Sequence, residues 1–187
     1  SSSTGIVRTA QWGQSGDIPV TFDYDADGTA DYVVYRPGSG YWYVANSVTN
    51  AMTSAWWGQP GDVVVPGDFD GVAGDDFNVW RPVTGEWLTL GGQTRLFRRT
   101  YQWGAPGDVP LAAQFGCSRK AGQTVWRAAQ NGQWWVFGLP IANWGEPGDV
   151  AVPANYLGDY AADYAVWRPS SGIWYVAQND RNARPCH

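Results

Sequence analysis

The chain has 187 residues, which is enough for one compact domain, and its formal net charge is −5. Such an acidic chain does not suit a phosphate backbone, and no apolar run approaches the ~20 residues that span a bilayer, so we expect neither nucleic acid nor a membrane span. Aromatic residues make up 16% of the sequence beside 24 Gly and 12 Pro, a composition that predicts an all-β protein with many tight turns.

In chain order, a short strand over residues 6–12 is followed by four further predicted strands. Residues 18–22 follow a Gly-Asp turn, and residues 32–36 alternate aromatic and aliphatic side chains. Residues 41–45 come after a Pro-Gly-Ser-Gly hairpin signal, and a last strand near residues 53–57 leads into the next Trp-Gly pair. Four antiparallel strands in succession are typical of one blade of a β-propeller.

The same unit then returns three times. Its Trp-Gly pair places glycine at Gly13, Gly58, Gly104 and Gly145, in steps of 45, 46 and 41 residues. An arginine ends the second strand of each copy with the same steps, at Arg36, Arg81, Arg127 and Arg168. A period near 45 residues that contains several short apolar runs indicates a propeller.

We therefore predict a single domain, residues 1–187, with four blades of four strands. The repeats cover about residues 11–55, 56–101, 102–142 and 143–178. Because the last repeat has no fourth strand of its own, the N-terminal strand 6–12 is expected to complete the fourth blade and close the ring. A half-ring that pairs with a second copy is the alternative.

Three positions in each repeat are nearly always tryptophan, and most of these rings are expected to pack between blades. The first set is Trp12, Trp57, Trp103 and Trp144; the second is Tyr35, Trp80, Trp126 and Trp167; the third is Trp42, Trp87, Trp134 and Trp174. The first set lies at the same kind of turn as the four arginines, so its indoles and those guanidinium groups are the candidate ligand-binding residues. An Asp after each Trp-Gly pair (Asp17, Asp62, Asp108, Asp149) could instead form a structural pair with the arginine of its own repeat.

The loop over residues 23–31 carries acidic residues in a spacing that suits calcium. Aspartates stand at its positions 1, 3, 5 and 9, and glycine stands at position 6. Calcium takes 6–8 oxygen ligands, and a backbone carbonyl at position 7 is a usual one. The predicted ligands are Asp23, Asp25, Asp27, Thr29 and Asp31.

The equivalent loops of the other repeats have lost part of this pattern. Repeat two keeps Asp68, Asp70 and Asp76, which predict a weaker site. Repeat four keeps Asn155, Asp159 and Asp163, with Leu157 at position 3. Repeat three has residues 114–120 there, Gln-Phe-Gly-Cys-Ser-Arg-Lys, and is expected to bind no metal.

The Trp-Gly-x-x-Gly-Asp phrase, the Asp-x-Asp-x-Asp-Gly-x-x-Asp loop and the Val-x-Arg-Pro-x-x-Gly-x-Trp-Tyr phrase together resemble FG-GAP/VCBS repeats. Such repeats occur in integrin-α-like propellers and in many bacterial secreted proteins. The resemblance covers roughly residues 6–178 and implies a propeller with calcium in the loops between first and second strands. Some propellers of this kind are lectins, and others are adhesion or accessory domains.

The two cysteines, Cys117 and Cys186, are expected to form a disulfide, because the nine residues after Ala177 can reach ~30 Å when extended. Cys117 stands where repeat three has lost its acidic loop, so the bond would fasten the C-terminal tail there. Two free thiols are the alternative.

Catalysis is not expected. The only histidine is His187, and the two glutamates, Glu86 and Glu146, lie in turns of different repeats. The leading hypothesis is a secreted, calcium-stabilised binding propeller, above all a carbohydrate-binding lectin for cell-surface glycans or polysaccharides. A protein–protein adhesion or accessory module of a larger secreted protein is the alternative, and an Asp-dependent glycan-active enzyme is the second alternative. The sequence leaves open a homo-oligomer.

Overall fold

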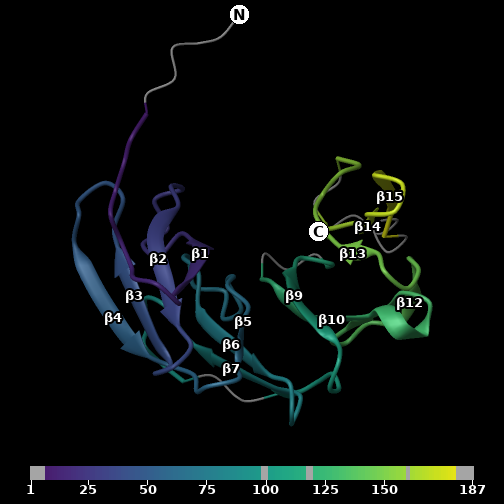
Figure 1. Ribbon diagram of the computed structural model, residues 1–187, viewed down its shortest axis with the longest axis horizontal. Coiled ribbons are helices and arrows are strands. Elements are labelled where there is room, and N and C mark those ends of the chain that lie inside the picture. The colour runs from purple at the N-terminus through teal and green to yellow at the C-terminus, as the bar shows by residue number, and fades with distance from the viewer. Residues whose placement is uncertain (1–6, 98–100, 117–119, 159–160, 180–187) are drawn as a thin grey trace, which may run out of the picture.

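The chain folds into four antiparallel sheets, one for each sequence repeat, that follow one another along an arc (Figure 1). The computed structural model describes residues 7–97, 101–116, 120–158 and 161–179. We number the sheets one to four in chain order. In Figure 1, β1, β5 and β9 lie on the inner side of the arc, and β4, β7 and β12 lie on its outer side. The all-β prediction is confirmed.

Within each sheet, consecutive strands are neighbours, so every connection is a simple hairpin or loop. Sheet one contains β1 (Ile18–Phe22), β2 (Asp31–Arg36), β3 (Tyr41–Ala45) and β4 (Met52–Trp56). Sheet two contains β5 (Val63–Val64), β6 (Phe77–Arg81), β7 (Glu86–Leu90) and β8 (Tyr101–Gln102). Sheet three contains β9 (Val109–Ala113), β10 (Gly122–Arg127), β11 (Gln133–Val136) and β12 (Ala142–Asn143), with the short 3₁₀ helix η1 (Ala128–Gln130) between β10 and β11. Sheet four contains β13 (Val150–Ala151), β14 (Tyr164–Arg168) and β15 (Ile173–Ala177).

The N-terminal segment differs from the prediction. Residues 7–12 form no strand, and sheet four has three strands instead of four. The indole of Trp12 donates a hydrogen bond to the Tyr43 carbonyl oxygen at 3.3 Å, which fixes the end of the segment on sheet one. Sheet four lies at the other end of the arc, and residues 7–12 of the same chain form no strand with it (Figure 1). Within the described residues, no hydrogen bonds close the arc into a ring.

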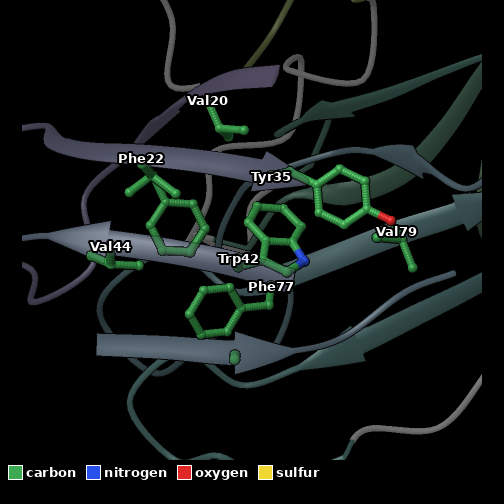
Figure 2. Close-up of a cluster of buried hydrophobic side chains, with 9 residues drawn as sticks. Val20, Phe22, Tyr35, Trp42, Val44, Phe77 and Val79 are labelled. Atoms are coloured by element: carbon green, nitrogen blue, oxygen red, sulfur yellow. The ribbon is translucent and has the colours of Figure 1, made fainter. Parts of the chain in front are cut away.

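The hydrophobic core consists of three clusters, one at each contact between neighbouring sheets. Between sheets one and two, the Trp42 ring packs against Phe22, Tyr35 and Phe77, with centroid separations of 5.8, 5.3 and 5.4 Å (Figure 2). Trp87 and Trp80 lie in the cluster between sheets two and three. Trp134 lies in the cluster between sheets three and four, where Phe115 stacks on Tyr164 at 5.0 Å. The expected packing of aromatic rings between sheets is therefore present at all three contacts.

One hydrogen bond recurs at every contact between sheets. The buried indoles of Trp42, Trp87 and Trp134 donate to the carbonyl oxygens of Trp57, Trp103 and Trp144 at 2.8, 2.9 and 2.8 Å. Each acceptor belongs to the Trp-Gly pair of the next repeat. Since the acceptor's own backbone N–H bonds back to a glycine of the preceding sheet, both directions of the backbone are satisfied.

That glycine must be glycine. Gly40, Gly85 and Gly132 have φ of 72°, 71° and 67°, a region that favours glycine. A Cβ atom on them would lie 2.3, 2.6 and 2.6 Å from the backbone of the next Trp-Gly pair. Tight backbone contact therefore sets the spacing of the sheets.

No helix in the described ranges is long and apolar enough to cross a bilayer.

We predict that Trp42→Phe lowers the free energy of unfolding by about 2–4 kcal/mol, because it opens a cavity and leaves the Trp57 carbonyl oxygen without its donor. Trp56→Phe is the matched control, since its ring is 69% exposed, and it should change the same quantity by about 0.5 kcal/mol or less. Urea denaturation followed by tryptophan fluorescence measures both. Equal losses in the two variants would contradict the role given to the Trp42 indole.

Candidate functional site

Each sheet carries the same aspartate–arginine pair on its rim. The guanidinium Nε donates to the aspartate of its own repeat at 2.8 Å in Arg36–Asp17, 2.9 Å in Arg81–Asp62, 2.7 Å in Arg127–Asp108 and 2.8 Å in Arg168–Asp149. A second bond from Nη2 makes every pair bidentate. The hydrogen bond from the arginine holds the pKa of Asp17 and that of Asp149 below the ordinary value. The four arginines are therefore fixed in position, as the structural interpretation of the sequence expected.

The four indoles of the Trp-Gly pairs are half-buried and also fixed. Trp12, Trp57, Trp103 and Trp144 donate their N–H groups to carbonyl oxygens of the third strand of their own sheets, at 3.3, 2.9, 2.9 and 3.1 Å. These indoles are candidate ligand-binding residues from the sequence. In the structure their N–H groups are used within the protein, so the ring faces are what a ligand could contact.

Three of the repeats have a cavity between the indole and the arginine. The cavity of repeat two is about 270 Å³, and its walls include Trp56, Trp57, Val79, Arg81 and Leu88. Those of repeats one and four are about 200 and 170 Å³ and have the same Trp-Gly, Val and Arg walls. The Trp and Arg of one cavity come from the same repeat.

The cavities differ in the residue that the third strand contributes to their walls. In repeats one and four, the guanidinium lies over a tyrosine ring, with Arg36 4.4 Å from the centroid of Tyr43 and Arg168 4.4 Å from that of Tyr175. In repeat two, Leu88 replaces the tyrosine, and the exposed Trp56 ring stands at the entrance. The repeat-two cavity is therefore the most apolar of the three.

Repeat three is built differently. Arg127 lies over the Trp135 ring at 4.8 Å, and the Trp103 ring packs against Trp135 at 6.0 Å and against Phe137 at 5.4 Å. Trp135 stands at the third-strand position of Tyr43, Leu88 and Tyr175, and Phe137 adds a further ring beside Trp103. The doubled tryptophan at residues 134–135 is a sequence signal for this difference that the repeat comparison did not use.

A second candidate site is the acidic loop before β2. Asp23, Asp25 and Asp27 can each bring one carboxylate oxygen within 4.8 Å of the others. Asn46 donates to Asp25 at 2.7 Å, and the backbone N–H of Gly28 donates to Asp23 at 3.0 Å, so the loop is ordered around the three side chains. The Asp23 Oδ1 atom is buried and accepts no hydrogen bond. A buried carboxylate oxygen without a donor fits a cation ligand, and carboxylate oxygens suit calcium.

Asp31, predicted as a further ligand, has another role. Its two oxygens accept hydrogen bonds from the backbone N–H groups of Tyr24 at 3.1 Å and Ser47 at 2.8 Å. The equivalent Asp76 and Asp163 also accept backbone N–H groups of their own loops. Position 9 therefore fixes the loop to the sheet, and Asp31 lies outside the triad.

The loop of repeat two also gathers three aspartates, Asp68, Asp70 and Asp76. Burial raises the pKa of Asp76 to about 6 and raises that of Asp68 above its ordinary value. The ammonium of Lys120, from the next repeat, donates to the Asp70 carbonyl oxygen at 2.5 Å, and its positive charge opposes the rise at Asp68. Lys120 thus supplies a fixed cation at this loop.

Sequence reasoning missed both Lys120 and Asn46. The signal for Lys120 was available, because it is the only lysine of the chain and stands in the loop that has lost its acids. The predicted Cys117–Cys186 disulfide and Asp159 lie outside the described residues.

The comparisons with known proteins give no relative. No protein-family model matches the chain, and neither a curated protein nor a solved structure matches it. The interpretation of both sites therefore depends on their chemistry alone.

We predict that Lys120→Gln strengthens calcium binding at the loop of repeat two by about tenfold or more, because the competing positive charge is removed. Calorimetric titration should then detect one more calcium ion per chain than in the wild type. Lys120→Arg keeps the charge and is the control without this gain. Identical titrations for wild type and Lys120→Gln would show that the lysine does not occupy the cation position.

Proposed function

We propose that the protein is a carbohydrate-binding module whose sites are the three rim cavities of repeats one, two and four. The observation that carries the proposal is the recurrence of one construction: a fixed indole face, a valine wall and a guanidinium held by a buried aspartate. Volumes of about 170–270 Å³ are below the ~300–1,000 Å³ of drug-sized pockets and suit a single small ring.

The chemistry of these cavities matches a sugar better than a purely apolar ligand. A pyranose has an apolar face that stacks on aromatic rings, and hydroxyl groups that accept from guanidinium N–H groups. Because the Asp–Arg pair fixes the guanidinium before binding, little conformational entropy is lost when a ligand arrives. Three similar sites on one chain would bind a polysaccharide or a glycan-covered surface by avidity.

The same reasoning favours binding over catalysis. The aspartates of the rim are paired with arginine, and several of those in the loops accept hydrogen bonds from backbone N–H groups or from Asn46. The sequence resemblance to FG-GAP/VCBS repeats supports a propeller-type module of a secreted protein, and the arc of four sheets is compatible with that proposal.

Calcium is proposed to act as a structural ion in the loop of repeat one. Asp23, Asp25 and Asp27 would hold it, and a backbone oxygen such as that of Thr29 could complete the shell. The ion would bring together three carboxylates that otherwise repel one another. In this way it would stabilise the connection between β1 and β2, next to the contact with sheet two.

Mutation of the repeat-two cavity tests the carbohydrate proposal. A glycan array first identifies ligands, and Trp56→Ala should then weaken binding of a positive glycan by roughly 5–30-fold, because about 1–2 kcal/mol of stacking is lost. Trp56→Phe keeps an aromatic face and should retain most of the affinity. An array without hits, or unchanged affinity in Trp56→Ala, would count against this site.

Removal of calcium tests the metal proposal separately. Addition of a chelator should lower the melting temperature, since an ion present at 100 times its dissociation constant contributes roughly 2.7 kcal/mol to the free energy of unfolding. Asp25→Ala should melt like the chelated wild type and respond no further to calcium. A melting temperature that ignores both treatments would exclude a structural ion.

A further inference from the structure

The two ends of the arc carry complementary, unused halves of the contact that joins neighbouring sheets. At each of the three contacts, the earlier sheet offers a tryptophan indole and a glycine, and the later repeat offers a Trp-Gly backbone. Among the described residues, sheet four meets no later repeat, and the Trp-Gly pair of repeat one meets no earlier sheet.

In sheet four, the tryptophan and the glycine of this contact have no partner from a following repeat within the described residues. Trp174 occupies the position of Trp42, Trp87 and Trp134, which are 0% exposed, yet 54% of its surface is exposed. Its indole N–H has no acceptor within the described residues, although the three equivalent indoles each have one. A Cβ on Gly172 would meet nothing within 4 Å, whereas the equivalent glycines touch the next Trp-Gly backbone.

In the N-terminal segment, the Trp-Gly pair has no partner from a preceding sheet within the described residues. Gly13 and Asp17 are more exposed than the equivalent residues of the other three repeats. A Cβ on Gly58, Gly104 or Gly145 would lie within 3.4 Å of an aromatic ring of the preceding sheet, from Tyr35, Trp80 and Trp126 respectively. A Cβ on Gly13 would meet Val34 and Asp17, both of its own repeat. The Trp12 backbone makes no hydrogen bond in the described part of the chain, whereas Trp57, Trp103 and Trp144 all do.

The free segment also matches the free strand edge in register. In sheets one and three, the buried tryptophan faces an alanine of the fourth strand, Trp42 opposite Ala55 and Trp134 opposite Ala142. Both alanines lie two residues before the next Trp-Gly tryptophan, and Ala10 lies two residues before Trp12. Residues 7–11 could therefore pair with β15 so that Ala10 faces Trp174, as a fourth strand of sheet four.

We propose that the N-terminal segment, residues 7–13, of one copy docks on sheet four of a second copy, and that two arcs close one ring through two such contacts. The segment of the same chain cannot be this fourth strand. Its Trp12 side chain is held on sheet one, and the three contacts between sheets place sheet four at the other end of the arc (Figure 1). A second copy supplies the missing strand without any change in those contacts. A twofold axis would relate the two contacts.

Docking would also place an aromatic ring behind the glycine of the repeat-one cavity. The aromatic ring that backs the glycine of a rim cavity comes from the preceding sheet in repeats two and four. For the repeat-one cavity, lined by Trp12, Gly13 and Arg36, that ring would be Trp167 of the second copy, which occupies the position of Tyr35, Trp80 and Trp126. In a single chain, Gly13 therefore lacks the aromatic neighbour that Gly58 and Gly145 have behind them.

The test is the mass of the chain in solution, measured by sedimentation velocity over a dilution series, and it needs no carbohydrate or calcium. We expect twice the 20.5 kDa of one chain. Gly172→Asn should give a monomer, since its Cβ would collide with the incoming Trp-Gly backbone, while asparagine tolerates the φ of 70°. Gly148→Asn, at a φ of 93° with nothing within 4 Å, is the matched control and should remain dimeric.

Mixing two defective chains separates docking from misfolding. Ala10→Arg disrupts the N-terminal docking segment and leaves sheet four intact. Gly172→Asn blocks the docking face of sheet four and leaves the segment intact. Each should be monomeric alone, and an equimolar mixture should form a one-to-one dimer through the one remaining good contact. A wild-type chain that sediments as a monomer would overturn the proposal. This holds whether a fluorescence quencher reaches Trp174 or not. Wild-type assemblies larger than two chains, or a mixture that stays monomeric, would overturn it as well.

Discussion

The structure depends on how one repeat is fastened to the next. A buried indole crosses from each sheet to the Trp-Gly backbone of the following repeat, and a glycine at positive φ lets the two backbones touch. The aromatic rings around these bonds form the core, so the direction and spacing of the sheets follow from the same few residues. Burial of the rings supplies most of the stabilisation, and the hydrogen bond gives the contact its geometry.

The rim sites follow from this fastening. Because the second strand places its tryptophan or tyrosine in the core, the next residue along, the arginine, emerges at the end of the strand beside the Asp of the Trp-Gly turn. The half-buried indole of that turn is oriented by its bond to the third strand. The rims of the four repeats differ in the third-strand residue beside the arginine, which is Tyr43, Leu88, Trp135 or Tyr175.

Much of this was predictable from the sequence, and the exceptions share a cause. The strands over residues 18–22 and 41–45 have the predicted bounds, because alternating burial and turn residues are local signals. The position of residues 7–12 was not predictable, since it depends on the angle between successive sheets. Asp31 and Lys120 likewise depend on neighbours brought together by the fold: Ser47 lies 16 residues from Asp31, and Asp70 lies 50 residues from Lys120. A repeat pattern identifies equivalent positions but not the partners that each position finds.

The division of the core into three separate clusters has a consequence for how damage spreads. Each cluster joins only two adjacent sheets, so the molecule resembles a one-dimensional array in which stability is a sum of units and nearest-neighbour contacts. Oxidation or substitution of a ring in one cluster would loosen two sheets and leave the distant pair folded. In a chain without its second copy, fraying would start at the ends, and amide hydrogens in sheet four would exchange with solvent sooner than those of the central sheets.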